Sequence, residues 1–392
     1  MFHVKHMDPL DYLSRELDRL EQEGLRRRPP THAAEGLSFC SNDYLGLAAS
    51  AAPAAASGAG ASRLIAGERD EHRRLERAFA SWLGLGDALA FSSGYAANVG
   101  ALSALAGPGD LVVSDALNHA SLIDGARLSR ARVAVVPHGD VDAVARALDG
   151  RSEARAWVVV ESYYSMDADS PDLAALREIC DARGAALFVD EAHALGVLGP
   201  GARGLCAEAG VRADVLVGTL GKAFGAQGAF VAGREVLRDW LWNRARSFVF
   251  STGLAPASAA AATRSLQTVI DHPELAARVA ALSARLRAGL AGAGATGEPL
   301  PAGAISDREP PRLLGRGHVV PLVVGSPGRA VRFAERMRGR GVEVHAIRPP
   351  TVPPGTARVR MTVTANHAPE DIDMAIAAFA SALRDDAAEG GA

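Results

Sequence analysis

The chain has 392 residues, of which 48% are hydrophobic and 22% are charged, and its formal net charge is −3. This length is typical of one large domain with a smaller one beside it, and the near-neutral charge argues against a nucleic-acid-binding protein. No apolar run approaches the ~20 residues of a membrane span, the start lacks the apolar core of a signal peptide, and three scattered cysteines favour neither disulfides nor a metal site. We therefore expect a globular, cytoplasmic protein without a bound metal.

The first expected elements are a helix and an arm. Four leucines recur at helical spacing between charged residues: Leu10, Leu13, Leu17 and Leu20. They predict an amphipathic helix over residues 8–23, which a polar link connects to a short strand near residues 37–40. Residues 50–62 are rich in Ala, Gly and Ser. This composition is typical of a flexible linker, or of a backbone that passes too close to a ligand for side chains.

Strands and helices are expected to alternate from about residue 68. The expected helices cover residues 68–83, 95–105, 120–129, 140–149 and 172–182. The expected strands cover residues 88–92, 111–114, 132–136, 156–161, 185–190 and 213–217. This alternation predicts an α/β domain with a mostly parallel, doubly wound sheet. We divide the chain into an N-terminal helix and arm (1–48), a large domain (49–288) and a smaller C-terminal α+β domain (289–392).

Polar segments fall at the carboxyl ends of several expected strands: Ser92–Gly94, Ser114–Asp115, Asp190 and Thr219–Lys222. Ligands of doubly wound sheets bind beyond the carboxyl ends of the strands. The placement therefore predicts one shared site.

Lys222 and Asp190 carry the functional prediction. A lysine after a strand is usually a solvated loop charge, and Asp190 could instead cap a helix. Together, however, an amine and a carboxylate at neighbouring strand ends suit pyridoxal phosphate (PLP), which forms an imine with the amine and needs a counter-charge at its ring nitrogen. Such a lysine needs its pKa lowered by burial or by nearby positive charge.

Two further segments suit the same cofactor. His119 could stack on the ring, although an exposed residue at a helix start is the simpler interpretation. The turn Ser92–Asn98 leads from a strand into a helix, whose first N–H groups could hold a phosphate or could merely be capped.

Four segments resemble the α-oxoamine synthase family: Ser41–Leu47, Ser165–Asp167, Asp190–His193 and Thr219–Lys222. Members of this family are fold-type-I PLP enzymes that join an amino acid to an acyl thioester with loss of CO₂. The resemblance covers nearly the whole chain. It implies a large domain with a seven-stranded, mostly parallel sheet, a smaller C-terminal domain, and a homodimer whose active site lies at the subunit interface.

The resemblance also implies roles for individual residues. Lys222 would carry PLP and move the Cα proton, and Asp190 would pair with the ring nitrogen. The other implied contacts to the cofactor are His193 and Ser165 at the O3′ side, His119 on the ring, Gly94, Tyr95 and Thr219 at the phosphate, and Ser251 and Thr252 from the neighbouring subunit.

The segment Ala346–Arg360 resembles the branch of the family that serves biotin synthesis. That branch joins L-alanine to a pimeloyl thioester of coenzyme A or of an acyl carrier protein. Leu25–Arg28 matches the same branch, and a guanidinium fits the free carboxylate of a pimeloyl chain through two parallel hydrogen bonds. A solvated helix end would explain these arginines equally well. The implied substrate-binding residues are Arg26, Asn42, His119, Thr351 and Arg360.

Two alternatives remain open. The chain could be an aminotransferase or a synthase for another acyl and amino acid pair, such as a glycine C-acetyltransferase. It could also be a non-catalytic partner subunit, although such subunits tend to lack the lysine. Some positions depart from the pattern without removing a reacting group: Tyr95, Tyr164, Ala168, Ala194, Leu195 and residues 57–67.

Overall fold

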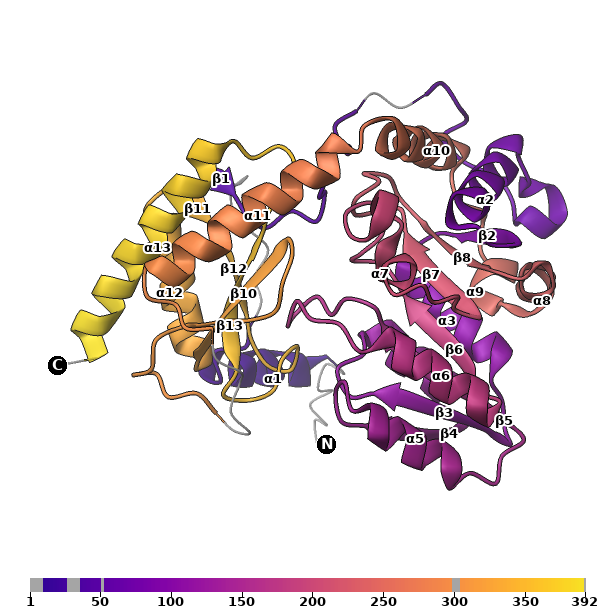
Figure 1. Cartoon of the computed structure of the whole chain (residues 1–392), viewed down its shortest axis with the longest axis horizontal. Helices are drawn as coiled ribbons and strands as arrows, with labels where there is room; N and C mark the ends of the chain where they lie inside the picture. The colour runs from indigo at the N-terminus through magenta and orange to yellow at the C-terminus, as the bar shows by residue number, and fades with distance from the viewer. Residues whose placement is uncertain (1–9, 27–35, 51–52, 298–303, 391–392) are drawn as a thin grey trace, which may run out of the picture.

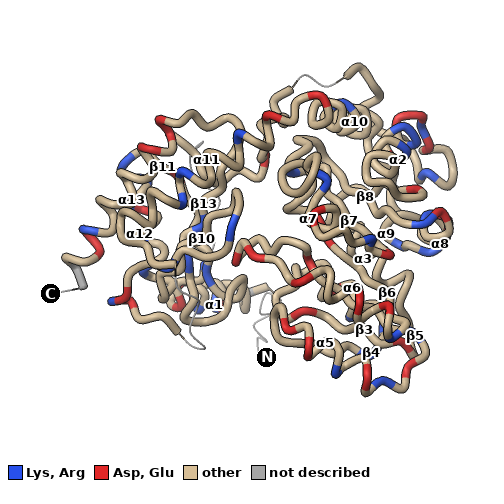
Figure 2. The backbone as a smooth tube through the Cα atoms, viewed as in Figure 1, with Lys and Arg blue, Asp and Glu red and all other residues tan. Residues whose placement is uncertain are grey.

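A computed structural model describes residues 10–26, 36–50, 53–297 and 304–390. Two bodies of secondary structure lie side by side, and the long helix α11 (Glu274–Gly292) runs from the larger body into the smaller one (Figure 1). Charges of both signs are interspersed over both bodies (Figure 2). Among the described helices, none is long and apolar enough to cross a membrane.

The larger body is built on a sheet of seven described strands in the order β2-β8-β7-β6-β5-β3-β4. The strands are β2 (Asp87–Phe91), β3 (Asp110–Asp115), β4 (Arg132–Val136), β5 (Arg155–Glu161), β6 (Ala186–Asp190), β7 (Val215–Thr219) and β8 (Ala229–Gly233). Only β8 runs antiparallel to its neighbours β2 and β7. The mostly parallel, seven-stranded sheet is therefore confirmed.

Helices cover both faces of this sheet, because its central strands are apolar on both sides. In β6, Leu187 and Val189 belong to the core on one face and Phe188 to the core on the other. The covering helices are α2 (Asp70–Leu83), α3 (Gly94–Leu105), α4 (Ala120–Ser129), α5 (Val141–Asp149), α6 (Leu173–Arg183), α7 (Gly204–Glu208), α8 (Glu235–Arg244), α9 (Arg246–Val249) and α10 (Pro256–Asp271), with the short helices η1 (Arg63–Gly67) and η2 (Pro200–Ala202). Each helix and strand that the sequence predicts in this region is present, close to its expected bounds.

The smaller body holds a four-stranded antiparallel sheet in the order β12-β13-β10-β9. Its strands are β9 (Arg312–Leu313), β10 (Val319–Gly325), β12 (His345–Ile347) and β13 (Ala357–Thr362), and α11, α12 (Pro327–Arg338) and α13 (Pro369–Gly390) pack around it. The arm after α1 (Asp11–Gln22) joins this body, because β1 (Leu37–Ser38) pairs in parallel with β11 (Val342–Glu343). Our division of the chain at residues 48 and 288 stays a prediction.

The described part of the Ala/Gly/Ser-rich segment, residues 53–62, is packed against the loop after α9. The N–H of Gly253 donates to the carbonyl of Ala61 at 3.0 Å, and a Cβ at Gly253 would lie 2.8 Å from Cγ of Arg63. This close passage of two backbones contradicts a flexible linker in these residues.

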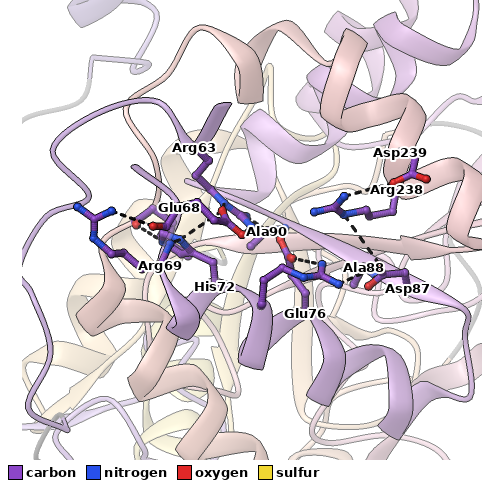
Figure 3. A network of polar contacts seen from close by, with 12 residues as sticks. Arg63, Glu68, Arg69, His72, Glu76, Asp87, Ala88, Ala90, Arg238 and Asp239 are labelled. Carbon is purple, nitrogen blue, oxygen red and sulfur yellow. Dashed lines mark hydrogen bonds and ion pairs between the residues drawn. The ribbon is translucent and has the colours of Figure 1, made fainter. Parts of the chain in front are cut away.

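A buried ion-pair cluster anchors the end of the same segment (Figure 3). The Arg63 guanidinium donates to Glu76 at 2.6 Å and to Glu68 at 2.5 Å, and it lies 5.3 Å from the ring centroids of Trp242 and Phe248. The cluster therefore connects η1 to α2, α8 and α9.

Candidate active site

The carboxyl ends of the parallel strands bring the predicted residues together. Glu161 at the end of β5 is the register partner of Asp190 at the end of β6, and Thr219 ends β7 just before Lys222. Parallel strands present their carboxyl ends at one edge of a sheet, and ligands of such sheets bind there. The structure therefore brings Asp190, Thr219 and Lys222 to the same edge of the sheet, where the sequence predicts a shared site.

Lys222 is held by a chain of two short contacts. Its Nζ lies 2.6 Å from Nε2 of His193, and Nδ1 of His193 lies 2.6 Å from the hydroxyl of Tyr44. His193 and Tyr44 are buried, and burial together with the charge of Lys222 holds the pKa of His193 well below its usual range. A neutral imidazole therefore faces the lysine amine.

The pKa of Lys222 is lowered to about 8. Burial is the main cause and Arg360 adds to it, while Asp190 and Glu161 act in the opposite direction. About a tenth of such amines are neutral at pH 7, against about one in 2,500 at the usual lysine pKa. This environment provides the nucleophilic amine that an imine-forming lysine needs.

Asp190 is buried, and both of its carboxylate oxygens accept hydrogen bonds. Nδ2 of Asn98 donates to Oδ2 at 2.7 Å, and the N–H of Ala192 donates to Oδ1 at 2.8 Å. The residues after Asp190 form a turn, so the helix-cap interpretation of this motif is wrong. Asn98 also donates to Ser121 at 2.9 Å, and Ser121 lies 2.7 Å from Nδ1 of His119.

His119 is the N-cap residue of α4, and its side chain is exposed toward a cavity. Its backbone N–H donates to Oε1 of Glu161 at 2.7 Å. The surrounding protein partly desolvates the imidazole, and this desolvation together with the charge of Lys222 lowers its pKa. The simpler interpretation of an exposed helix start is thus correct, and the same residue also lines the candidate site.

The start of α3 lies beside the end of β7. Ser93 caps the helix by accepting from the N–H of Ala96 at 3.1 Å, and a Cβ at Gly94 would lie 3.8 Å from Oγ1 of Thr219. The first N–H groups of a helix favour an anion. The hydroxyl of Tyr95 contacts Asp124, so only its backbone remains for such an anion.

A cavity of about 800 Å³ opens beside His119 and Glu161. Its lining combines strand-end residues of the larger body with the proline-rich segment of the smaller one: His119, Ile123, Glu161, Tyr164, Ser165, Met166, Asp167 and residues 349–354. Ser165 and Thr351 therefore share one cavity with His119. Arg358 of the smaller body connects the two walls of the cavity. It is buried, and it donates to the carbonyl of Met166 at 2.6 Å and to Asp167 at 2.8 Å in the larger body.

Arg360 has one donor group unused. Its Nη2 donates to Oδ1 of Asn42 at 2.9 Å, while its buried Nε has no hydrogen-bond partner among the described residues. An unpaired buried donor is costly, so a bound acceptor is its natural complement. A carboxylate supplies the matching geometry.

The remaining predicted residues lie outside this arrangement. Ser251 donates to the carbonyl of Phe248 at 3.0 Å, and neither Ser251 nor Thr252 lines the described cavity. Arg26 lies 3.5 Å from Glu21, which favours the solvated helix end, and the next two arginines fall outside the described residues. The assignments of Ser251, Thr252 and Arg26 stay predictions.

Five residues of the site were missed by the sequence analysis: Tyr44, Asn98, Ser121, Glu161 and Arg358. The sequence could have identified Glu161, because this residue ends a predicted strand, as Asp190 does. The others act through contacts between distant segments. Ala168 has a φ of 57°, in the left-handed region that glycine adopts more readily than alanine.

A family model described as aminotransferase class I and II matches residues 34–379. The chain belongs to this family. One relative is 8-amino-7-oxononanoate synthase of Anaeromyxobacter dehalogenans (strain 2CP-1 / ATCC BAA-258), 44% identical over 398 residues that cover 96% of each chain. The protein of the same name from Mycolicibacterium smegmatis (strain ATCC 700084 / mc(2)155) is 45% identical over 385 residues, covering 94% of this chain and 95% of that one.

Solved structures agree with this membership. Serine palmitoyltransferase of S. paucimobilis with bound PLP–myriocin has a TM-score of 0.86 and 26% identity, covering 97% of this chain and all of that chain. The 8-amino-7-oxononanoate synthase of Francisella tularensis has a TM-score of 0.72 at 23% identity, covering 89% of this chain and 98% of that chain, and so supports the fold. The fold-type-I architecture, the resemblance to α-oxoamine synthases, the PLP cofactor and the class of acyltransferase are confirmed.

Proposed function

We propose that the protein condenses L-alanine with a pimeloyl thioester of coenzyme A or acyl carrier protein. The products are 8-amino-7-oxononanoate, CO₂ and the free thiol, and the reaction is a step of biotin synthesis in the cytoplasm. The main support is the amine of Lys222, which lies 2.6 Å from a neutral histidine at the edge of the sheet. Relatives named 8-amino-7-oxononanoate synthase, which match nearly the full chain, support the same product.

The residues of the edge fit the cofactor. Lys222 would bind PLP covalently, Asp190 would pair with its ring nitrogen, and the start of α3 with Thr219 would hold its phosphate. Asn98 and the N–H of Ala192 keep the Asp190 carboxylate oriented for that pairing. When bound, PLP supplies an electron-withdrawing ring that stabilises a carbanion at the α-carbon of the amino acid.

The substrate contacts are assigned to Arg360, to Lys222 and to the proline-rich wall of the cavity. Nε of Arg360 would bind the carboxylate of alanine, with Asn42 holding the guanidinium in place. The neutral amine of Lys222 would accept the proton from the α-carbon. The proline-rich wall, residues 349–354, would hold the acyl chain and exclude water, so that both substrates meet in one orientation.

An apolar surface supports a homodimer. Ile65 and Phe250 are 83% and 74% exposed, and Tyr95 is half exposed. The segments that carry them are in contact, because Ser62 donates to the carbonyl of Val249 and Ser247 to that of Ala96. Exposed apolar clusters of this kind mark protein interfaces. A second copy covering them would bring its own Ser251 and Thr252 to the phosphate region, as the family resemblance implies.

The test is thiol release by PLP-loaded enzyme given L-alanine and pimeloyl-CoA, with glycine and succinyl-CoA or palmitoyl-CoA for comparison. We expect release with alanine and pimeloyl-CoA, and none from Lys222→Ala. Release confined to another pair would overturn the substrates while keeping the chemistry. Conversion of the cofactor to pyridoxamine phosphate by alanine, without thiol release, would identify an aminotransferase instead.

A further inference from the structure

Glu161 is a carboxyl group of the site to which the proposed reaction gives no role. It is buried, it lines the cavity, and it stands beside Asp190 as its register partner. Register partners on parallel strands point to the same face of a sheet. The site therefore holds two carboxyl groups side by side, and only Asp190 has a cofactor atom to pair with.

The contacts of Glu161 separate into two kinds. Its Oε1 accepts the N–H of His119 at 2.7 Å and so fixes the residue from which α4 begins. An uncharged oxygen could make that contact equally well. Its charge, by contrast, acts on every ionisable group that faces it.

We propose that Glu161 is a positioning residue with two separable effects: its oxygen holds His119 in the cavity, and its negative charge, when present, stabilises the protonated form of the group at Lys222. The inference rests on the proposed function, in which Lys222 carries PLP.

The groups that act on Glu161 are the carboxylates of Asp190 and Asp115, the amine of Lys222 and the backbone N–H of His119. The hydroxyl of Tyr164 accepts its backbone N–H at 3.2 Å. Burial and the charge of Asp190 raise the pKa of Glu161 to about 8, against a smaller effect of Lys222. Glu161 thus carries its proton at neutral pH and loses it in the alkaline range, where the amine titrates as well.

Two substitutions separate the two effects. Glu161→Gln keeps an oxygen for His119 but never ionises, whereas Glu161→Ala removes both the oxygen and the charge. Glu178→Gln is the matched control, because Glu178 lies on an exposed position of α6. Thermal unfolding of all three variants checks that they are folded.

The readout is the visible absorption of bound PLP between about pH 5 and about pH 10, together with the dissociation constant of PLP. Loss of a nearby negative charge makes a proton easier to remove. For Glu161→Gln we expect the absorption midpoint to fall by about half a pH unit or more, with PLP affinity within about threefold of wild type. For Glu161→Ala we expect the same shift with about tenfold weaker PLP binding, because His119 is released.

Each effect can be overturned separately. A Glu161→Gln midpoint equal to that of wild type and Glu178→Gln would refute the effect of charge. Equal PLP affinities of Glu161→Gln and Glu161→Ala would refute the holding of His119. If Lys222→Ala shows the same pH titration of the absorption band as wild type, PLP is not joined to Lys222, and the proposed function fails together with this inference. If Lys222→Ala abolishes that titration, the failure is confined to Glu161.

Discussion

At the scale of single residues, the hydroxyl of Tyr44 controls the histidine that faces the reactive amine. Burial raises the pKa of Tyr44, so the phenol keeps its proton throughout the working range. A permanent hydroxyl 2.6 Å from Nδ1 anchors the ring and leaves Nε2 toward Lys222. The orientation of His193 therefore depends on a residue that touches no reacting atom.

Replacing Tyr44 by phenylalanine tests this dependence. The substitution removes one hydroxyl with almost no change in volume, so we expect kcat to fall about tenfold while the melting temperature changes little. Steady-state kinetics measures kcat, and thermal unfolding measures the melting temperature. Tyr12→Phe on the exposed side of α1 is the control. An unchanged kcat in Tyr44→Phe would show that the hydroxyl has no part in positioning His193.

Arg360 is expected to act on substrate binding. Arg360→Lys keeps the charge but loses the planar set of N–H donors, so the KM for alanine should rise about tenfold or more. The dissociation constant of PLP should remain that of wild type. The exposed Arg264→Lys provides the control for surface effects. An unchanged KM would show that Arg360 does not bind the carboxylate.

The lowered pKa of Lys222 predicts how the stability of the cofactor-free protein depends on pH. Between about 8 and the usual value of 10.5, the unfolded chain binds a proton at this amine that the folded chain lacks. The amine therefore opposes folding fully below about pH 8, and this cost disappears as the pH rises toward 10.5.

Lys222→Met should accordingly melt at a higher temperature than the wild-type apoprotein at neutral pH, with the difference shrinking above about pH 8. Thermal unfolding at several pH values measures this difference. A gap independent of pH would mean that the amine is not perturbed in the folded protein.

The sequence predicted Lys222, Asp190 and His193 because each follows a strand within a short motif. It did not identify Tyr44 or Asn98, because their effects depend on partners 149 and 92 residues away. Long-range contacts of this kind leave no periodic signal in one sequence. The free donor of Arg360 likewise becomes visible only when its surroundings are known.

At the scale of elements, the alternating pattern predicted the strands and helices of the large domain up to β7, but not β8. Ala229–Gly233 contains two alanines and a final glycine, residues with little preference for a strand. Its extended form comes from pairing with β2 on one side and β7 on the other. Local composition carries no information about that pairing.

The ion pairs of the Arg63 cluster hold the short helix η1 against its neighbouring helices. The side chain of Arg63 is 1% exposed and that of Glu76 is fully buried. Removing one partner of a buried pair costs up to about 3–5 kcal/mol, and Glu76 would keep only Arg73 at 2.5 Å as its ion-pair partner. We therefore expect Arg63→Met to lower the melting temperature by about 5 °C or more.

An exposed pair gives the matched control. Arg285 and Asp373 form an ion pair with side chains 48% and 54% exposed. Surface pairs contribute at most about 1 kcal/mol, so Arg285→Met should leave the melting temperature nearly unchanged. Equal effects of the two substitutions would show that the Arg63 cluster contributes no more than a surface pair.

At the scale of the whole molecule, the exposed apolar cluster around Phe250 predicts assembly. A charge placed at its centre should separate the subunits, because an aspartate cannot be buried there without a partner. For Phe250→Asp we expect a monomer by analytical ultracentrifugation, together with weaker PLP binding. Met374→Asp, on α13 of the smaller body, should remain a dimer. A dimeric Phe250→Asp would place the interface elsewhere.

The pairing of β1 with β11 can form only late in the synthesis of the chain. Leu37 finds its partner Val342 about 300 residues later. At about 5–20 residues per second, a ribosome needs roughly 15–60 s to synthesise that interval. The strand β1 therefore has no partner while the larger body is synthesised. Any nascent chain released before β11 emerges leaves this strand edge open, and such edges are the sites at which incomplete chains aggregate.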